Sequence, residues 1–196
     1  MRISWAQLAQ DINECRACGL ADGCRQKVPG QGDPCAPLML IGEGPGEQED
    51  RQGLAFVGPA GQLLTKMLAA IDLPRERVFI CNVVKCRPPH NRQHAPEEMA
   101  ACIGHLRGQV ALVRPRVIVL LGATALSAVL GAQYRITRCH GQLFERKGVW
   151  ILPTYHPSAL LRDESKKREA WNDLNIVRRK LAELSLYDDL LKEEAQ

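Results

Sequence analysis

The sequence predicts an α/β fold in which helices cover both faces of a mostly parallel sheet. Four apolar runs are typical of buried strands, at 38–41, 77–84, 115–122 and 149–154. Segments with helical periodicity separate these runs, and this alternation favours parallel strands joined by crossover helices. Ligands of such folds bind outside the carboxyl ends of the strands, so we expect the functional residues there.

Each expected helix has its own signal in the sequence. The segment 60–71 carries leucines at helical spacing. A second helix begins at Pro96, because proline followed by two acids is favoured in a first helical turn. A short helix at 123–131 ends at a glycine, and a basic amphipathic helix covers about 166–184.

The composition indicates an ordinary globular protein. The 196 residues are 45% hydrophobic and 24% charged, with a formal net charge of +4. This balance suits a single domain over 1–196 and permits an acidic partner such as nucleic acid. We find no apolar run of about 18 residues and no signal-peptide pattern, so we expect no membrane segment and a cytoplasmic location. The acidic tail from about residue 185 is expected to fray.

The eight cysteines favour metal binding or redox chemistry, because a reducing compartment disfavours structural disulfides. Cys15 and Cys18 form a C-x2-C pair, and Cys86 and Cys102 form a C-x15-C pair. Four such thiolates can hold zinc or a [4Fe–4S] cluster, and the long second spacing favours iron–sulfur. Cys24 could compete as a ligand. The other cysteines are expected to pack in the interior or to be spare thiols: Cys35, Cys81 and Cys139.

The stretch GEGPGEQED at 42–50 follows the first strand with three glycines and four acids. The glycines permit a sharp turn and a close approach of backbone N–H groups to a ligand. A phosphate loop would carry a Lys after the glycines, so the acids argue against phosphate. On its own, the stretch is also compatible with an ordinary corner between a strand and a loop.

Five separated motifs resemble those of the iron–sulfur uracil-DNA glycosylases, often called family 4. They are GEGPGEQED, GLAFVGPAGQLL, NVVKCRPP, the two cysteine pairs and HPSALLR, and together they cover nearly the whole chain. The resemblance implies a three-layer α/β sandwich with a central four-stranded parallel sheet and helices on both faces. It also implies a [4Fe–4S] cluster on Cys15, Cys18, Cys86 and Cys102. The implied activity is hydrolysis of the N-glycosidic bond of uracil in DNA by a monomer, which releases uracil and leaves an abasic site.

The same resemblance assigns the contacts to an extruded uracil. Phe56 is the ring that stacks on the base, and Asn82 reads the O4 acceptor and the N3–H donor. His156 donates to O2, where charge accumulates as the bond breaks. Cytosine presents the opposite pattern to Asn82, so the wrong base would leave buried polar groups unpaired.

The turn after the first strand is expected to bring the backbone of Gly42, Glu43 and Gly44 to the uracil. Gly44 stands where better-known uracil-DNA glycosylases carry a catalytic Asp, so Glu43 and Glu47 are the candidates to activate water. Either carboxylate can also stabilise an oxocarbenium ion by its charge alone. Glu47 is also a candidate to crowd the 5-methyl of thymine, because Gly46 stands where those relatives have a blocking Tyr.

Contacts with DNA are expected from the segment after the last strand and from basic loops. Leu160 is the predicted wedge that fills the vacated base stack, with Leu161 as the alternative. Arg138 and Arg162 are candidates to hold phosphates. Further residues share this expectation: Gly58, Gly61, Thr137, His140 and Gly141.

The loop before the second predicted helix carries His90 and His94, where the family usually has small or polar residues. A branch of the superfamily uses a loop His to trap the sugar covalently, so covalent trapping is an alternative to hydrolysis. Contact with DNA phosphates is the ordinary expectation for both histidines. A second alternative is an inactive DNA-binding module, against which the intact Phe56, Asn82 and His156 argue, and a third is an iron–sulfur electron carrier.

Overall fold

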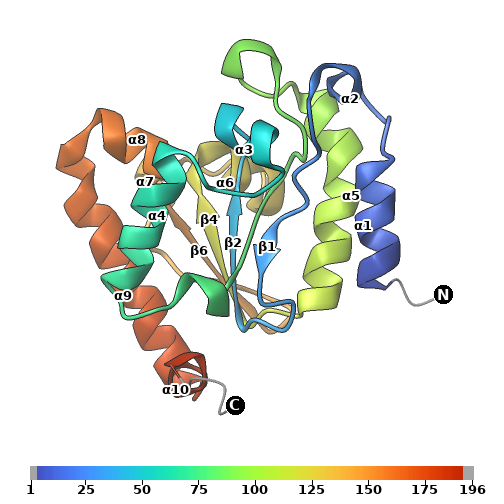
Figure 1. Cartoon of the computed structure of the whole chain (residues 1–196). Coiled ribbons are helices and arrows are strands. Elements are labelled where there is room, and N and C mark those ends of the chain that lie inside the picture. Colours follow the sequence, from blue (N-terminus) through green and yellow to red (C-terminus); the bar gives the residue numbers. More distant parts are fainter. Residues whose placement is uncertain (1–3, 192–196) are drawn as a thin grey trace.

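The computed structural model describes residues 4–191 and arranges them around one six-stranded sheet (Figure 1). The strand order is β1-β3-β2-β4-β6-β5. The α/β class is confirmed, because helices lie on both faces of this sheet. The four inner strands run parallel and match the four predicted runs: β3 (Phe79–Asn82), β2 (Leu38–Gly42), β4 (Val117–Leu121) and β6 (Val149–Thr154).

The prediction of a four-stranded, purely parallel sheet is wrong at both edges. β1 (Gln31–Gly32) pairs antiparallel with β3, and β5 (Phe144–Arg146) pairs antiparallel with β6. Lys147 and Gly148 connect β5 to β6 with positive φ angles of 52° and 77°, as tight hairpin turns require. Strands this short carry almost no alternation in the sequence, and hydrophobic periodicity therefore misses them.

Helices cover the two faces of the sheet in separate groups. They are α1 (Trp5–Asn13), α2 (Leu20–Gly23), α3 (Glu47–Gln52), α4 (Pro59–Ala69), α5 (Pro96–Val113), α6 (Gly122–Leu130), α7 (Ile136–Cys139), α8 (Pro157–Arg162), α9 (Lys167–Glu183) and α10 (Tyr187–Leu191), with 3-10 turns η1 (Arg75–Arg77), η2 (Pro89–Asn91) and η3 (Glu164–Lys166). In Figure 1, α4 and α9 lie to the left of the sheet, and α1 and α5 lie to its right. None of the helices within residues 4–191 is long and apolar enough to cross a membrane.

The central strand β2 is buried at all five positions. Because side chains alternate along a strand, Leu38 and Leu40 pack into the core under α4 and α9. Met39 and Ile41 pack into the opposite core, under α5 and α6. Burial on both faces is the reason why the sequence of this strand is continuously apolar.

The acidic tail from about residue 185, for which fraying is expected, is described as far as residue 191. Residues 187–191 form α10, in which Tyr187 and Leu190 are buried against the core. The Tyr187 hydroxyl donates a hydrogen bond to the Ile71 carbonyl over 2.8 Å. Residues 192–196, the acidic end of the tail, lie outside the described residues.

The carboxyl ends of the parallel strands all lie at the same end of the sheet, beneath α3 in Figure 1. β2 ends at Gly42, which pairs with Asn82 at the end of β3. On the other side, β4 ends at Leu121 beside Thr154, the last residue of β6. The predicted site residues therefore converge on this edge, although they come from distant parts of the sequence.

Substitutions at two helical glycines test how closely the protein is packed beside the Phe56 loop. A Cβ at Gly61 in α4 would overlap the Phe56 carbonyl, whereas a Cβ at Gly104 in α5 would meet no atom of the described residues within 4 Å. We expect Gly61→Ala to destabilise the protein by about 1–3 kcal/mol through overpacking. Gly104→Ala should instead stabilise it by about 1 kcal/mol, because alanine is the better helix former. Urea unfolding followed by circular dichroism measures both changes, and equal effects of the two substitutions would contradict this packing.

Candidate active site

A cavity of about 610 Å³ opens at the carboxyl edge of the sheet, within the size range of pockets that take small organic ligands. Its walls come from the strand ends and from the loops that precede α4 and α5. Six predicted site residues line it: Glu43, Gly44, Phe56, Asn82, His156 and Arg162. The lining also includes residues that the sequence did not connect with the base: Glu49, His94, Thr124 and Tyr155.

Glu43 follows β2 and directs its carboxylate at two partners. The Thr124 hydroxyl donates to Oε2 over 2.7 Å, and Nδ1 of the His94 ring lies 3.1 Å from Oε1. The hydrogen bonds from His94 and Thr124 hold the pKa of Glu43 at about 2, against the opposing effect of burial. Glu43 is therefore ionised at neutral pH, and it can stabilise a cation in the cavity but is a poor proton acceptor.

His94 is a neighbour of Glu43 that the sequence did not predict. Its side chain is 4% exposed, and its Nε2 lies 3.3 Å from the Cys86 carbonyl oxygen. A Cβ at Gly44 would overlap the His94 ring, so the missing side chain at Gly44 makes room for the histidine. The expected phosphate contact does not fit a side chain enclosed in this way, whereas His90 is exposed.

Asn82 ends β3 with a side chain that is almost fully buried. Its Oδ1 has no hydrogen-bond partner among residues 4–191, although buried polar atoms are normally paired. A Cβ at Gly42 would lie 2.5 Å from this oxygen and 2.5 Å from Cζ of Phe56, so only glycine leaves room for both side chains. Because Asn82 lines the cavity, a donor on a bound ligand would supply the missing partner.

Phe56 forms an aromatic wall of the cavity beside His156. The centroids of the two rings are 5.7 Å apart, and their planes make an angle of 35°. The Phe56 backbone is left-handed, with φ at 53°, a conformation that costs a bulky residue about 1–3 kcal/mol. A flat ring in the same cavity as Asn82 can stack on a planar ligand while the amide binds the edge of that ligand.

His156 follows β6 and caps the first turn of α8. Its Nδ1 accepts a hydrogen bond from the Ser158 backbone N–H over 3.1 Å, so a neutral ring carries its proton on Nε2. Burial lowers the pKa of His156 to about 4, and the ring is therefore neutral at pH 7. In this state the Nε2–H group is the donor that the ring offers to a ligand.

Glu47 lies outside the set of described residues that line the cavity. It stands on the exposed side of α3, where it forms an ion pair with Arg51 and lies 3.7 Å from Arg87. Of the two predicted catalytic carboxylates, only Glu43 reaches the cavity, so the geometry does not support Glu47 in that role. Glu49, from the same helix, lines the cavity in its place.

The wedge prediction for Leu160 does not fit its burial. Leu160 is 1% exposed and packs with Tyr155 and Ala170. The next residue, Leu161, is 47% exposed on the surface of α8, and it is therefore the leucine that can reach into a base stack. Sequence reasoning placed both residues on one short helix, but only the packing of α8 shows which side faces the solvent.

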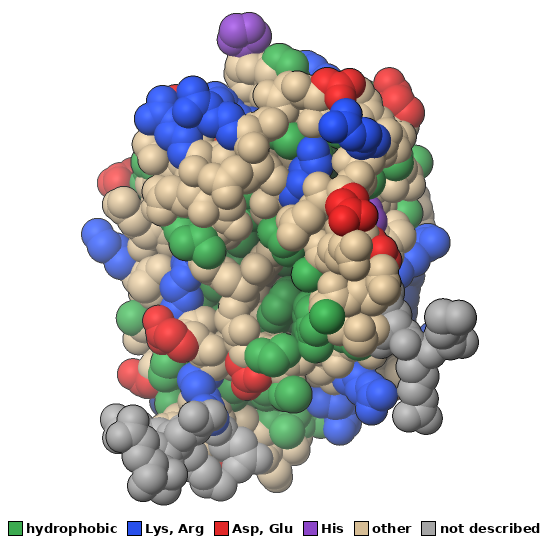
Figure 2. All heavy atoms as spheres, turned by 45° about the vertical axis from the view of Figure 1, so that its right-hand side comes forward, with side chains coloured by type: hydrophobic (Ala, Val, Ile, Leu, Met, Phe, Trp, Pro, Cys, Tyr) green, Lys and Arg blue, Asp and Glu red, His purple; other side chains and the backbone are tan. Residues whose placement is uncertain are grey.

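The two arginines predicted to hold phosphates are both exposed. Arg162 lines the cavity, and Arg138 is exposed on α7. Figure 2 shows a cluster of Lys and Arg side chains at its upper left, at the height of α3 and α8 in Figure 1. His140, another predicted phosphate contact, instead directs its Nδ1 at Asp173, 3.2 Å away. The glycines predicted to contact DNA, Gly58, Gly61 and Gly141, are not among the described residues that line the cavity, and neither is Gly42.

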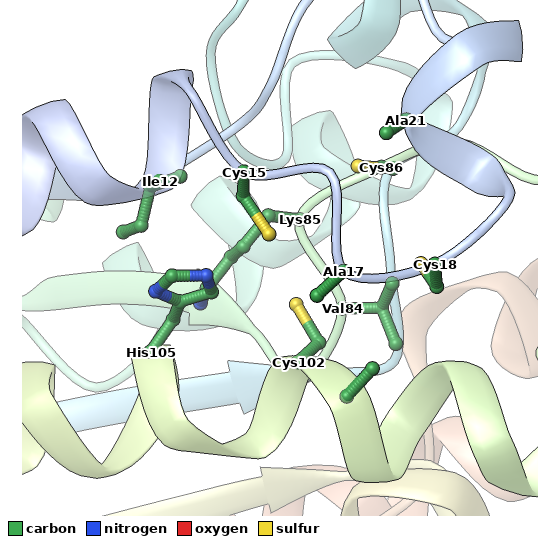
Figure 3. Close-up of a pocket in the computed structure, with 11 residues that line it drawn as sticks. Ile12, Cys15, Ala17, Cys18, Ala21, Val84, Lys85, Cys86, Cys102 and His105 are labelled. Carbon is green, nitrogen blue, oxygen red and sulfur yellow. The ribbon is translucent and has the colours of Figure 1, made fainter.

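The four predicted ligand cysteines line one small pocket on the other side of the β3 end (Figure 3). They arrive from different elements: the loop between α1 and α2 carries Cys15 and Cys18, Cys86 follows β3, and Cys102 lies on α5. Figure 3 shows the sulfurs of Cys15 and Cys102 pointing toward each other. Cys24 lies against Cys86 and lines no part of this pocket in the described chain.

The chemistry of this pocket fits a group that prefers sulfur ligands. Burial raises the pKa of the Cys86 and Cys102 thiols, so as thiolates they would need a positive partner. No carboxylate is present in the described lining, whereas Lys85 and His105 are. As arranged here, no three metal-ligating side chains of residues 4–191 form a metal-binding group.

Comparisons with known proteins bear on these two pockets. A family model described as the uracil DNA glycosylase superfamily matches residues 29–175. The type-4 uracil-DNA glycosylase of Thermotoga maritima is 45% identical over 162 residues, which cover 82% of this chain and 84% of that protein. The type-4 enzyme of Archaeoglobus fulgidus is 40% identical over 178 residues, which cover 87% and 89%. A type-5 uracil-DNA glycosylase of Pyrobaculum aerophilum is 36% identical over 150 residues, which cover 68% and 66%.

The cavity combines a buried amide and a neutral histidine, which follow or end parallel strands, with an aromatic ring from the loop before α4, and this arrangement suits a planar ligand. The chain belongs to the uracil DNA glycosylase superfamily, and within it to the type-4 group. The type-4 relatives align over more of the chain than the type-5 relative, in agreement with this assignment.

The depressed pKa of His156 predicts how stability depends on pH. The unfolded chain takes up this proton near pH 6.5, whereas the folded protein resists it until about pH 4. Stability is therefore fully present above pH 6.5 and is lost as the pH falls toward 4, by on the order of 3 kcal/mol. We expect urea unfolding between pH 7.5 and 4.5 to show this loss and His156→Gln to flatten it. His90→Gln, a change at an exposed histidine, is the control, and an unchanged slope in His156→Gln would contradict the burial argument.

Proposed function

We propose that this protein hydrolyses the N-glycosidic bond of uracil in DNA and so begins base-excision repair. The observation that carries the proposal is the buried Oδ1 of Asn82, which lines the cavity and lacks a partner among the described residues. An unpaired acceptor at such a place is costly unless a ligand donates to it. The N3–H of a flipped uracil is a donor of this kind.

The same amide explains the choice of base. The Oδ1 atom of Asn82 accepts from N3–H of uracil while the amide nitrogen donates to O4. Cytosine carries an unprotonated N3 and an amine at the position of O4, so it would leave both ends of the amide unpaired. Loss of such buried hydrogen bonds is a strong basis for rejection, stronger than the exclusion of a methyl group.

Catalysis needs stabilisation of two charges that develop as the bond breaks. The uracil departs as an anion, and the Nε2–H of His156 supplies a donor for its O2. The sugar becomes a cation, and the ionised carboxylate of Glu43 lies in the same cavity to stabilise it. Because both Glu43 oxygens already accept hydrogen bonds, its contribution is its charge and the orientation of the attacking water.

We expect the protein to act as a monomer on uracil-containing DNA. Leu161 fills the space that the flipped nucleotide vacates, while Arg162 and Arg138 hold phosphates. The exposure of all three side chains supports this assignment. Phe56 then stacks on the extruded base inside the cavity.

We further propose that Cys15, Cys18, Cys86 and Cys102 hold a [4Fe–4S] cluster. The support is their shared pocket and its sulfur-rich, carboxylate-poor lining. When bound, the cluster supplies a covalent tie between a loop, a strand end and a helix. Cys86 is four residues after Asn82, so this tie also steadies the strand end that carries the base-reading amide.

Incubation with a uracil-containing oligonucleotide, followed by alkaline cleavage at abasic sites, tests the proposed activity. We expect uracil release by the natural protein and a loss of about a hundredfold or more in Asn82→Asp, because a carboxylate repels O4 and cannot donate to it. The ratio of cytosine to uracil release should rise, since the carboxylate accepts from the cytosine amine. Asn172→Asp, an exposed change on α9, is the matched control and should leave both rates unchanged.

Three outcomes of this assay would contradict the proposal. Absence of uracil release by the natural protein would favour an inactive DNA-binding module. A protein–DNA band that survives SDS and heat, and that disappears in His90→Ala or His94→Ala, would favour covalent trapping. Unchanged selectivity in Asn82→Asp would remove Asn82 from base recognition.

Iron analysis tests the proposed cluster. Protein purified without oxygen should contain about four iron atoms per chain, as four thiolates holding a [4Fe–4S] cluster require. We expect Cys86→Ala to lose this iron and much of the soluble protein. Cys139→Ala should keep both, because Cys139 is equally buried but lies outside the cysteine pocket. One zinc ion per chain and no iron would contradict the assignment of a [4Fe–4S] cluster.

A further inference from the structure

The Arg75 guanidinium forms hydrogen bonds with the backbone of the loop that carries Phe56. Its Nη2 donates to the carbonyl oxygens of Ala55 and Phe56, both over 2.8 Å. Its Nη1 donates to the Thr65 hydroxyl over 3.0 Å and lies 3.4 Å from the Gly61 carbonyl oxygen. Arg75 thus joins this loop to α4, and it stands outside the described lining of the cavity.

The backbone that Arg75 holds is strained. Phe56 has φ at 53°, and a left-handed conformation of a bulky residue persists only where the surroundings enforce it. The carbonyl of Ala55 is buried and accepts a second hydrogen bond, from Gln31 Nε2 over 2.6 Å. Without the guanidinium, the Phe56 carbonyl would lose the charged donor that the structure gives it, and the loop could relax toward an ordinary conformation.

Two further contacts confine the loop, and they do not replace Arg75. Glu49 Oε1 accepts from the backbone N–H groups of Val57 and Gly58, over 2.9 and 2.8 Å. Gly61 lies directly against the Phe56 carbonyl, with no room for a side chain. These contacts fix the loop after Phe56 and the packing against α4. Gln31 binds only the Ala55 carbonyl, whereas Arg75 binds the carbonyls of both Ala55 and Phe56.

We infer that Arg75 is a positioning residue for base excision, which holds the left-handed Phe56 backbone so that the ring is in place before a base enters. This role rests on the proposed function, because Phe56 matters only if a base stacks on it. The guanidinium is suited to the task because its planar fork binds two groups of acceptors at fixed angles, which an ammonium does not do. We expect Arg75 to act through the Phe56 loop, since it is not among the described residues that line the cavity.

Single-turnover kinetics on a uracil-containing duplex test this role. We expect Arg75→Met to slow uracil release by about ten- to a hundredfold, because small misplacements of a binding group have large effects on rate. Affinity for undamaged DNA of the same sequence should change by less than about threefold, because phosphate contacts and the wedge remain. Arg75→Lys should recover part of the rate.

Arg146→Met is the matched control. Arg146 also donates through both Nη atoms to two backbone carbonyls, those of Val129 and Leu130, but at the end of α6. This variant should release uracil at the natural rate. A similar loss of rate in Arg146→Met would show that the enzyme slows whenever an arginine that binds two backbone carbonyls is lost. That result would contradict a specific role of Arg75.

A double-mutant cycle separates positioning from general stability. In a Phe56→Ala background, Arg75→Met should cause little further loss of rate, because the ring that Arg75 positions is already absent. If the double variant instead loses rate by the product of the two single losses, the inference is overturned. If Arg75→Met fails to fold, the same cycle is run with Arg75→Lys, for which the same two outcomes apply.

The results also distinguish this inference from the proposed function. No uracil release by the natural protein would refute the proposed function itself. Release by the natural protein, together with an undiminished rate in Arg75→Met, would refute only the role of Arg75.

Discussion

Gly42 and Asn82 pair across the ends of β2 and β3, and the geometry of the site depends on this register. The pairing puts the turn that carries Glu43 beside the buried amide, and the absent side chain at Gly42 lets the Phe56 ring approach that amide. A slip of one residue would turn Asn82 to the opposite face of the sheet. The parallel pairing of β2 with β3, inside a sheet that is buried on both faces, therefore fixes the relative positions of the cavity residues at these two strand ends.

Glu43 and Glu49 lie near the carboxyl ends of the strands but accept hydrogen bonds from different groups. Glu43 accepts from the Thr124 hydroxyl and from the ring and backbone N–H of His94, and it keeps its charge inside the cavity. Glu49 accepts from the backbone N–H groups of Gly46, Val57 and Gly58, and so it ties the turn after β2 to the Phe56 loop. One carboxylate keeps its charge in the cavity and the other holds two loops together, although both lie within the same acidic stretch of sequence.

The segment 82–86 connects the cavity to the cysteine pocket. Asn82 contributes its side chain to the cavity, while its carbonyl accepts from the buried Lys85 ammonium over 2.5 Å. Cys86 contributes its thiol to the cysteine pocket, while its carbonyl faces His94, which in turn contacts Glu43. The two pockets thus share one stretch of backbone, so we expect a change at the cysteines to affect the residues that line the cavity.

The sequence by itself determined the α/β class and the four parallel strands, and its resemblance to a known family pointed to Glu43, Phe56, Asn82 and His156, all of which line the cavity. Apolar runs and strand-end motifs are local, and parallel strands bring their ends to one edge by geometry. Only the tertiary structure showed that Glu43 lines the cavity and Glu47 does not, and that Leu161 is exposed whereas Leu160 is buried, because the side that a short helix buries depends on what packs against it. It also revealed Arg75 and His94 as partners of Phe56 and Glu43. These pairs are 19 and 51 residues apart, and contacts over such separations leave no period in a sequence that could predict them.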